Sequence, residues 1–162
     1  MDTIEIFGNP FTLVNQISDK DEVTLGDDKV VIQRHWKKSK TLLTEFLSDL
    51  LHEKILELSK QIEVEGKVGL LGELDFEIRQ KIDSKKNRIA KLKGNTILVK
   101  LNAVALPETA LKYIIIHELA HTTLKRHSEK FWKTVETLYP EYIKAQGLLQ
   151  QYENKLNSSL LF

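Results

Sequence analysis

Six short segments of this sequence carry apolar residues at the spacing of β-strands, with polar residues between them. The predicted strands are residues 3–7, 11–17, 29–33, 74–82, 88–92 and 96–101. Gly8-Asn9-Pro10 and Gly94-Asn95 provide turn residues between neighbouring strands, which indicates two hairpins. Residues 18–22 are charged and predict a loop.

Four other segments repeat apolar residues at three- and four-residue steps instead, which predicts helices. The first covers residues 41–64 and should end at Gly66 and Gly69. The second is placed at residues 107–125, with Pro107 in its first turn and Glu108 near its positive end.

Two shorter helices are predicted after these, one capped by Ser128 and one opened by Pro140. The first is expected to point Phe131, Trp132, Val135 and Leu138 inward, and the second bears the apolar residues Tyr142, Ile143, Leu148, Leu149 and Tyr152. Together the segments predict an α+β fold, in which a small, mostly antiparallel sheet packs against several helices.

The second predicted helix contains His117-Glu118-Leu119-Ala120-His121, and His127 follows six residues later. Residues four apart on a helix lie roughly 6 Å apart along the axis and about 40° apart around it, so both histidines can hold one metal ion. Glu118 lies on the adjoining edge, where it can reach a metal-bound water as a general base. This arrangement is typical of zinc hydrolases.

The residues before this motif are strongly apolar, so the helix is expected to be buried and its polar side chains to need partners. His127 is the expected third ligand, and Glu129 and Glu136 compete with it for that position. The other two histidines, His35 and His52, stand in charged stretches and are predicted to be solvated.

Length and composition limit the other possibilities. With 162 residues, the chain is expected to be one domain, made of a sheet and long helix over residues 1–105 and a metal-binding helical part over 106–157. A net charge of +1 gives no reason to expect a nucleic-acid or membrane partner. The absence of cysteine excludes disulfides and thiolate zinc sites and fits a cytoplasmic protein. Neither a secretory signal nor a membrane-spanning segment is expected.

The motif and the residues around it resemble the YgjP-like metallopeptidase family, which is related to the SprT-like and WLM zincins. The matching residues are the HELAH motif, His127-Ser128, Phe131-Trp132 and Pro140-Glu141-Tyr142. The resemblance is specific over about residues 95–145. It implies a zincin-like fold, zinc at His117, His121 and His127, and a catalytic role for Glu118.

The expected function is therefore zinc-dependent hydrolysis of a protein or peptide, with Glu118 taking a proton from the attacking water and passing it to the leaving amine. The strand over residues 96–101 is the expected sheet edge for an extended substrate. Tyr139 or Tyr142 is a candidate oxyanion donor, although packing in the core is the more common role for such residues.

Two other functions remain open. The basic residues Lys81, Lys85, Lys86, Arg88, Lys91 and Lys93 form a segment that could hold the phosphates of a nucleoside triphosphate, an activity suggested within the resembled family. In that case the chain is a zinc-dependent pyrophosphatase. Alternatively, it is a zinc-stabilised module that binds DNA or protein without turnover, and the basic segment is its docking surface.

Overall fold

The computed structural model describes residues 2–66, 74–83 and 88–157. Gly69, predicted to help end the first helix, lies outside these residues. The predicted α+β class is confirmed, but the strands form two small mixed sheets rather than one. No helix in the described part of the chain is long and apolar enough to cross a membrane.

The N-terminal sheet has the strand order β1-β2-β4-β3. Its strands are β1 (Thr3–Ile6), β2 (Asn9–Ile17), β3 (Glu22–Leu25) and β4 (Lys29–Arg34). The predicted β1–β2 hairpin is confirmed, whereas β2 and β4 pair in parallel. The sequence did not predict β3, because a four-residue strand with two apolar residues is too short to display an alternation.

The second sheet has the order β5-β7-β6. It consists of β5 (Asp75–Arg79), β6 (Ala90–Lys93) and β7 (Thr96–Lys100). The predicted hairpin around Gly94 is confirmed as the antiparallel pair β6–β7. The expectation that residues 96–101 form a sheet edge is wrong, because β7 also pairs in parallel with β5 and is therefore central. The strand β6 occupies an edge instead.

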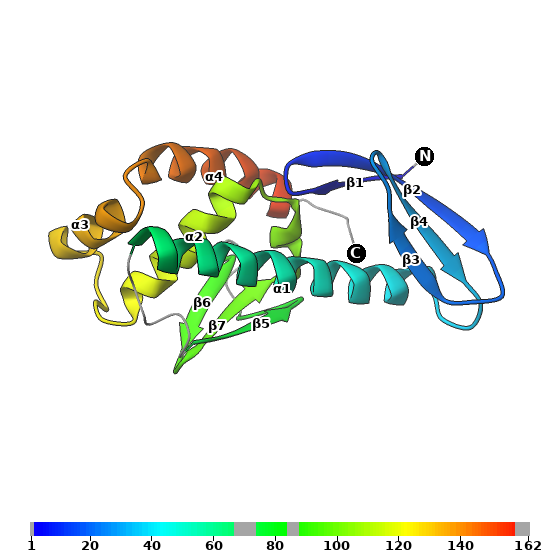
Figure 1. Cartoon of the computed structure of the whole chain (residues 1–162), viewed down its shortest axis with the longest axis horizontal. Coiled ribbons are helices and arrows are strands. Elements are labelled where there is room, and N and C mark those ends of the chain that lie inside the picture. The colour runs from blue at the N-terminus through cyan, green and yellow to red at the C-terminus, as the bar shows by residue number, and fades with distance from the viewer. Residues whose placement is uncertain (1, 67–73, 84–87, 158–162) are drawn as a thin grey trace.

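Four α-helices and a short 3-10 helix also lie in the described part of the chain. They are α1 (Ser39–Gly66), η2 (Leu101–Ala105), α2 (Glu108–His121), α3 (Glu129–Leu138) and α4 (Tyr142–Asn157). The long helix α1 runs from the N-terminal sheet to the second sheet (Figure 1). One apolar stripe of α1 is buried along its whole length, as its three- and four-residue repeat predicts.

The motif helix α2 lies at the centre of the helical part and contacts α1, α3, α4 and β6. Nine of its fourteen residues are buried, so apolar contacts surround it as predicted. Two ion pairs also join it to α1, Lys54 with Glu108 at 2.5 Å and Lys112 with Glu65 at 2.7 Å. Apolar packing and two partly exposed ion pairs thus join α2 to its neighbours.

The two C-terminal helices are present as predicted. Ser128 caps α3 as expected, since its Oγ accepts a hydrogen bond from the Phe131 N–H at 3.3 Å. In α4, Ile143 is apolar but 67% exposed. Ala145 is buried in its place, because the inward face of α4 follows Tyr142, Ala145 and Leu149 at three- and four-residue steps.

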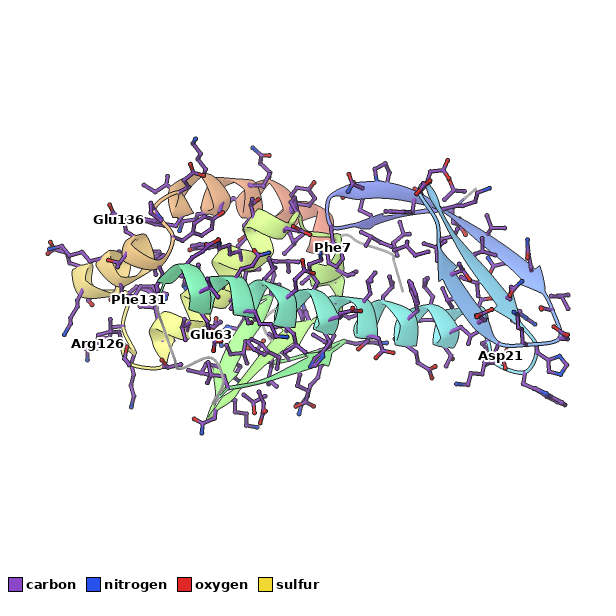
Figure 2. The ribbon with its side chains drawn as sticks, viewed as in Figure 1. Phe7, Asp21, Glu63, Arg126, Phe131 and Glu136 are labelled. Atoms are coloured by element: carbon purple, nitrogen blue, oxygen red, sulfur yellow. The ribbon has the colours of Figure 1, made fainter. Side chains whose placement is uncertain are left out.

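The β1–β2 turn is anchored to the segment that leads into α2. The Phe7 N–H donates to the carbonyl of Val104 at 2.7 Å, and the Gly8 N–H donates to that of Ala105 at 2.9 Å. Gly8 has a φ of +83°, and a Cβ there would lie 3.1 Å from Cγ of Pro107. Phe7 lies where the N-terminal sheet meets the helices (Figure 2). Position 8 therefore favours glycine for two separate reasons, the positive φ and the close approach of Pro107.

Three glycine-to-alanine substitutions separate these two requirements. Gly94→Ala should reduce the free energy of unfolding by about 1–2 kcal/mol, because position 94 has a φ of +62° but open space around it. Gly8→Ala should cost roughly 1–3 kcal/mol more than that, because the methyl group also meets Pro107. Gly147→Ala, in helix α4 with open space, should stabilise by about 0.5–1 kcal/mol. Urea unfolding measures all three, and equal losses at positions 8 and 94 would contradict a packing role for Gly8.

Candidate active site

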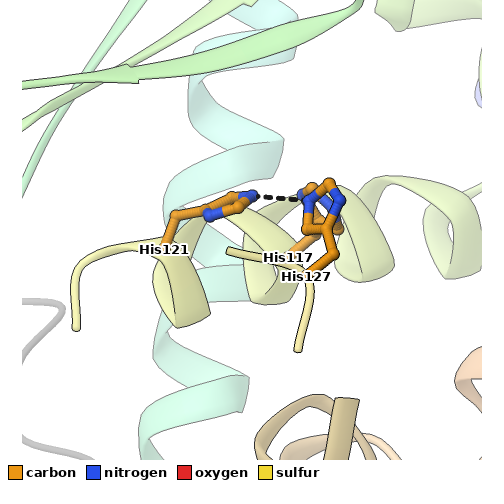
Figure 3. A group of neighbouring side chains, drawn as sticks. All are labelled: His117, His121 and His127. Atoms are coloured by element: carbon orange, nitrogen blue, oxygen red, sulfur yellow. Dashed lines mark hydrogen bonds between the residues drawn. The ribbon is translucent and has the colours of Figure 1, made fainter. Parts of the chain in front are cut away.

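The structure brings together the three histidines predicted as ligands. His117 and His121 extend from the last turns of α2, and His127 approaches from the loop before α3 (Figure 3). One ring nitrogen from each lies within 4.8 Å of the other two. The Nε2 atoms of His121 and His127 are 3.0 Å apart. Three nitrogen donors therefore face a common point.

This convergence depends on an early end to α2. The helix was predicted to continue to residue 125, but it ends at His121. Thr122 closes the last turn, its hydroxyl donating to the carbonyl of Leu119 at 2.6 Å. The chain then reverses and carries His127 back towards His121. A helix that continued to residue 125 would direct the following loop away from the two histidines.

The hydrogen bonding of His121 indicates which of its nitrogens is available. Its Nδ1 lies 3.1 Å from the carbonyl oxygen of Leu124, which can only accept. Nδ1 therefore carries the proton, and Nε2 presents a lone pair towards the other imidazoles. Such a bond from a ligand histidine to a backbone carbonyl is common at metal sites, where it fixes the tautomer.

The spacing of the nitrogens also fits a metal ion. Zinc–nitrogen bonds of about 2.0–2.1 Å place two nitrogens of a tetrahedral site roughly 3.3 Å apart. The observed 3.0 Å between two Nε2 atoms is close to that value. This pair of nitrogens therefore suits a small divalent cation, and a nitrogen of His117 lies within 4.8 Å of both.

An aromatic pair on α3 supports the three rings. The Phe131 ring is fully buried and lies 5.2, 4.6 and 4.9 Å from the rings of His117, His121 and His127. Trp132 lies 5.7 Å from His127, centroid to centroid. The sequence placed both aromatics in the core but did not show that they pack beneath the histidines. Burial, followed by the nearby His117 and His121, lowers the pKa of His127, which favours the neutral imidazole that a metal requires.

Glu118 is the acidic residue of this site. It is 7% exposed, and its Oε1 lies 3.5 Å from Nδ1 of His117. It borders two cavities, a larger one of about 1010 Å³ and a smaller one of about 200 Å³, and both also contact His117 and Ala90. The carboxylate therefore lies where the two cavities meet, in reach of the solvent that fills them.

The larger cavity contacts all three histidines and the edge strand β6. The smaller one lies between α2 and α4, with the side chains of Tyr113 and Gln146 hydrogen-bonded to each other in its wall. Burial raises the pKa of Tyr113 to about 12, so its hydroxyl stays protonated at neutral pH. Sequence reasoning missed both residues, although Tyr113 lies four residues before His117 and hence on the same helix face.

The other proposed ligands and donors lie elsewhere. Glu129 and Glu136 are exposed on α3 and are not part of the histidine cluster (Figure 2 labels Glu136). Tyr142 stacks on Trp132 with centroids 5.7 Å apart, and Tyr139 packs beneath Lys112. Neither tyrosine borders the two cavities, which favours the packing role that was considered for them.

The remaining histidines and the basic segment are only partly as expected. His35 is exposed, but His52 is half-buried, and its Nε2 lies 3.2 Å from the carbonyl oxygen of Phe76. The prediction that His52 is solvated is therefore wrong. From the basic segment, Arg88 and Lys91 border the larger cavity, whereas Lys81 and Lys93 do not. Lys85 and Lys86 lie outside the described residues.

Comparison with known proteins identifies the family of this chain. No curated protein matches the sequence. The crystal structure of the metallopeptidase zymogen abylysin from Pyrococcus abyssi is similar, with 28% sequence identity and a TM-score of 0.48, over 63% of this chain and 94% of that one. Residues 1–152 match the metallopeptidase domain of the YgjP-like family. Because that match extends over nearly the whole sequence, the chain belongs to the YgjP-like metallopeptidase family.

Proposed function

We propose that this protein is a zinc-dependent metallopeptidase with His117, His121 and His127 as the metal ligands and Glu118 as the general base. The observation that carries the proposal is the convergence of three imidazole nitrogens beside a buried carboxylate. Membership of a metallopeptidase family supports a protein or peptide as the substrate. Three imidazoles suit zinc, although nickel, copper and iron also accept such ligands.

A zinc ion bound there would polarise the substrate carbonyl and make a water molecule easier to deprotonate. Glu118 supplies the complementary step. Its carboxylate, at the junction of the two cavities, accepts the proton of the attacking water and then delivers it to the leaving amine.

The edge strand β6 provides a place for the substrate backbone. Among the described residues it pairs only with β7, and Ala90, Lys91 and Leu92 border the cavity that contains the histidines. An extended peptide can add to such an edge through main-chain hydrogen bonds, which hold it independently of its sequence. The role first assigned to residues 96–101 therefore passes to β6.

The whole chain is proposed to act as a single metallohydrolase domain. Residues 1–105 provide the sheets and the long helix, and residues 106–157 carry the metal ligands. The contacts of α1 with both sheets and with α2 support the proposal that the two parts form one domain.

Glu118→Gln tests the general base. The amide keeps the size of the side chain but cannot accept the proton, so hydrolysis of a peptide library should fall about 100-fold or more while one metal ion stays bound. Elemental analysis and the rate of peptide cleavage are the two measurements. Glu136→Gln is the matched control on exposed α3 and should keep full activity. Retained turnover in Glu118→Gln would exclude this role.

His127→Ala tests the third ligand. Loss of a residue that only supports a metal ligand costs about 10–100-fold in affinity, so loss of a ligand itself should cost at least about 100-fold. Metal titration of the apoprotein measures this affinity, and elemental analysis of the purified wild type identifies the ion. The stabilisation that the metal gives the wild type, measured as a shift in Tm, should disappear with it.

His35→Ala is the control for this experiment, because His35 is exposed and lies outside the histidine cluster. It should bind metal like the wild type. Unchanged affinity in His127→Ala would instead show that the third ligand is another residue.

A further inference from the structure

We propose that the larger cavity selects peptides with acidic side chains close to the bond that is cleaved, and that Lys91 and Lys125 are the residues that recognise them. This inference rests on the proposed peptidase function and names its substrate class. It arises from the charges that border the cavity, which the mechanism does not use.

The charges around the larger cavity are unbalanced. Arg88, Lys91 and Lys125 border it, and Glu118 is the only carboxylate among the residues that do so in the described part of the chain. The whole sequence, by contrast, is nearly neutral, with 24 basic and 23 acidic residues. The excess of positive charge is therefore a local property of the cavity rather than a consequence of composition.

Two of these cations come from different elements that border the same cavity. Lys91 belongs to the edge strand β6, and Lys125 belongs to the loop that joins the ligands His121 and His127. A peptide paired with β6 would thus have one cation on the strand beside it and another on the loop that joins the ligands. The three histidines border this cavity as well, so the two lysines and the candidate metal ligands share it.

Lys91 and Lys125 have no ion-pair partner among the residues that the structure describes. Arg88 differs, because its Nη1 lies 3.3 Å from Oδ2 of Asp83, which offsets its charge. Unpaired cations in a concave surface attract anionic groups more strongly than isolated surface charges do. An acidic side chain of the substrate would supply the missing partner.

The positive charge of the larger cavity is not shared by the smaller one. The smaller cavity shares His117 and Glu118 with the larger one, but Glu153 borders it and no lysine or arginine does so in the described residues. Acidic side chains are therefore attracted to the larger cavity and repelled from the smaller one. The preference should apply to positions on one side of the cleaved bond and not to those on the other.

Peptide libraries of different charge test this selection on the full-length metal-loaded protein. The wild type should cleave a library rich in Asp and Glu about tenfold faster, as kcat/KM, than one rich in Lys and Arg. The double variant Lys91→Glu/Lys125→Glu should reverse that order. Raising the ionic strength from about 0.05 M to about 0.5 M should reduce the wild-type preference, because salt screens the attraction. Mass spectrometry of the products shows on which side of each cut the acidic residues lie.

Lys130→Glu is the matched control, since Lys130 is exposed on α3 and does not border the cavity. It changes the net charge but should leave the preference intact. Lys125→Gln, a milder change, should reduce the preference without reversing it and guards against misfolding of the double variant. Equal cleavage of both libraries by the wild type, or an equal effect of Lys130→Glu, would overturn the inference while leaving the peptidase proposal standing.

A binding measurement separates this inference from the proposed function. Fluorescence anisotropy of labelled acidic and basic peptides with Glu118→Gln reports selection without turnover. Glu118→Gln should bind acidic peptides more tightly than basic ones. If this difference disappears when Lys91→Glu and Lys125→Glu are added to the same variant, the inference is supported even if no peptide is cleaved. ATP is tested in parallel: if ATP binds and is hydrolysed while acidic peptides are ignored, the cations serve phosphates and the inference fails.

Discussion

The reversal of the chain after His121 is the constraint on which the candidate site depends. A metal held by three imidazoles needs a third nitrogen on the same side of α2 as the first two, which no residue of the helix itself supplies in this sequence. The chain meets this need by ending α2 at His121 and returning His127 through a short loop. Thr122 and the carbonyl of Leu124 hold that loop through hydrogen bonds. The same carbonyl fixes the tautomer of His121, so backbone geometry and ligand chemistry are linked at one residue.

Apolar packing then keeps the reversed chain in place. Ser128 starts α3 directly after the loop, which brings the buried Phe131 ring against all three imidazoles. Filling this space with an aromatic ring keeps the histidines from turning into the core, where polar groups without partners are costly. Glu118 faces a similar cost, and its position between two cavities gives the carboxylate access to solvent. The helix can therefore be apolar on almost every side and still carry reactive groups at one end.

Much of the site could be predicted from the sequence because its pattern is local. The spacing of His117, Glu118 and His121 is set by helix geometry alone, and His127 follows within a few residues. The fold class and most helices are likewise visible from periodicity. The central position of β7 could not be predicted, because strand order depends on pairing with β5, about twenty residues away in the sequence. The contribution of Tyr113 and Gln146 to a cavity was hidden for the same reason, since it requires α4 to pack against α2. The exposure of Ile143 could not be predicted either. Its position around the helix decides whether it faces the core or the solvent, and the sequence alone does not fix how α4 is turned.

The contact between the first hairpin and the start of α2 joins positions about one hundred residues apart in the sequence. The contact is of long range in the sequence, so it forms only when distant parts of the chain have been brought together. The backbone amide protons of Phe7 and Gly8 can therefore report on the separation of these two segments, because their exchange with solvent requires the two hydrogen bonds to open. The turn is far from the histidines in the sequence, yet its hydrogen exchange reports whether the segment that leads into their helix is in place.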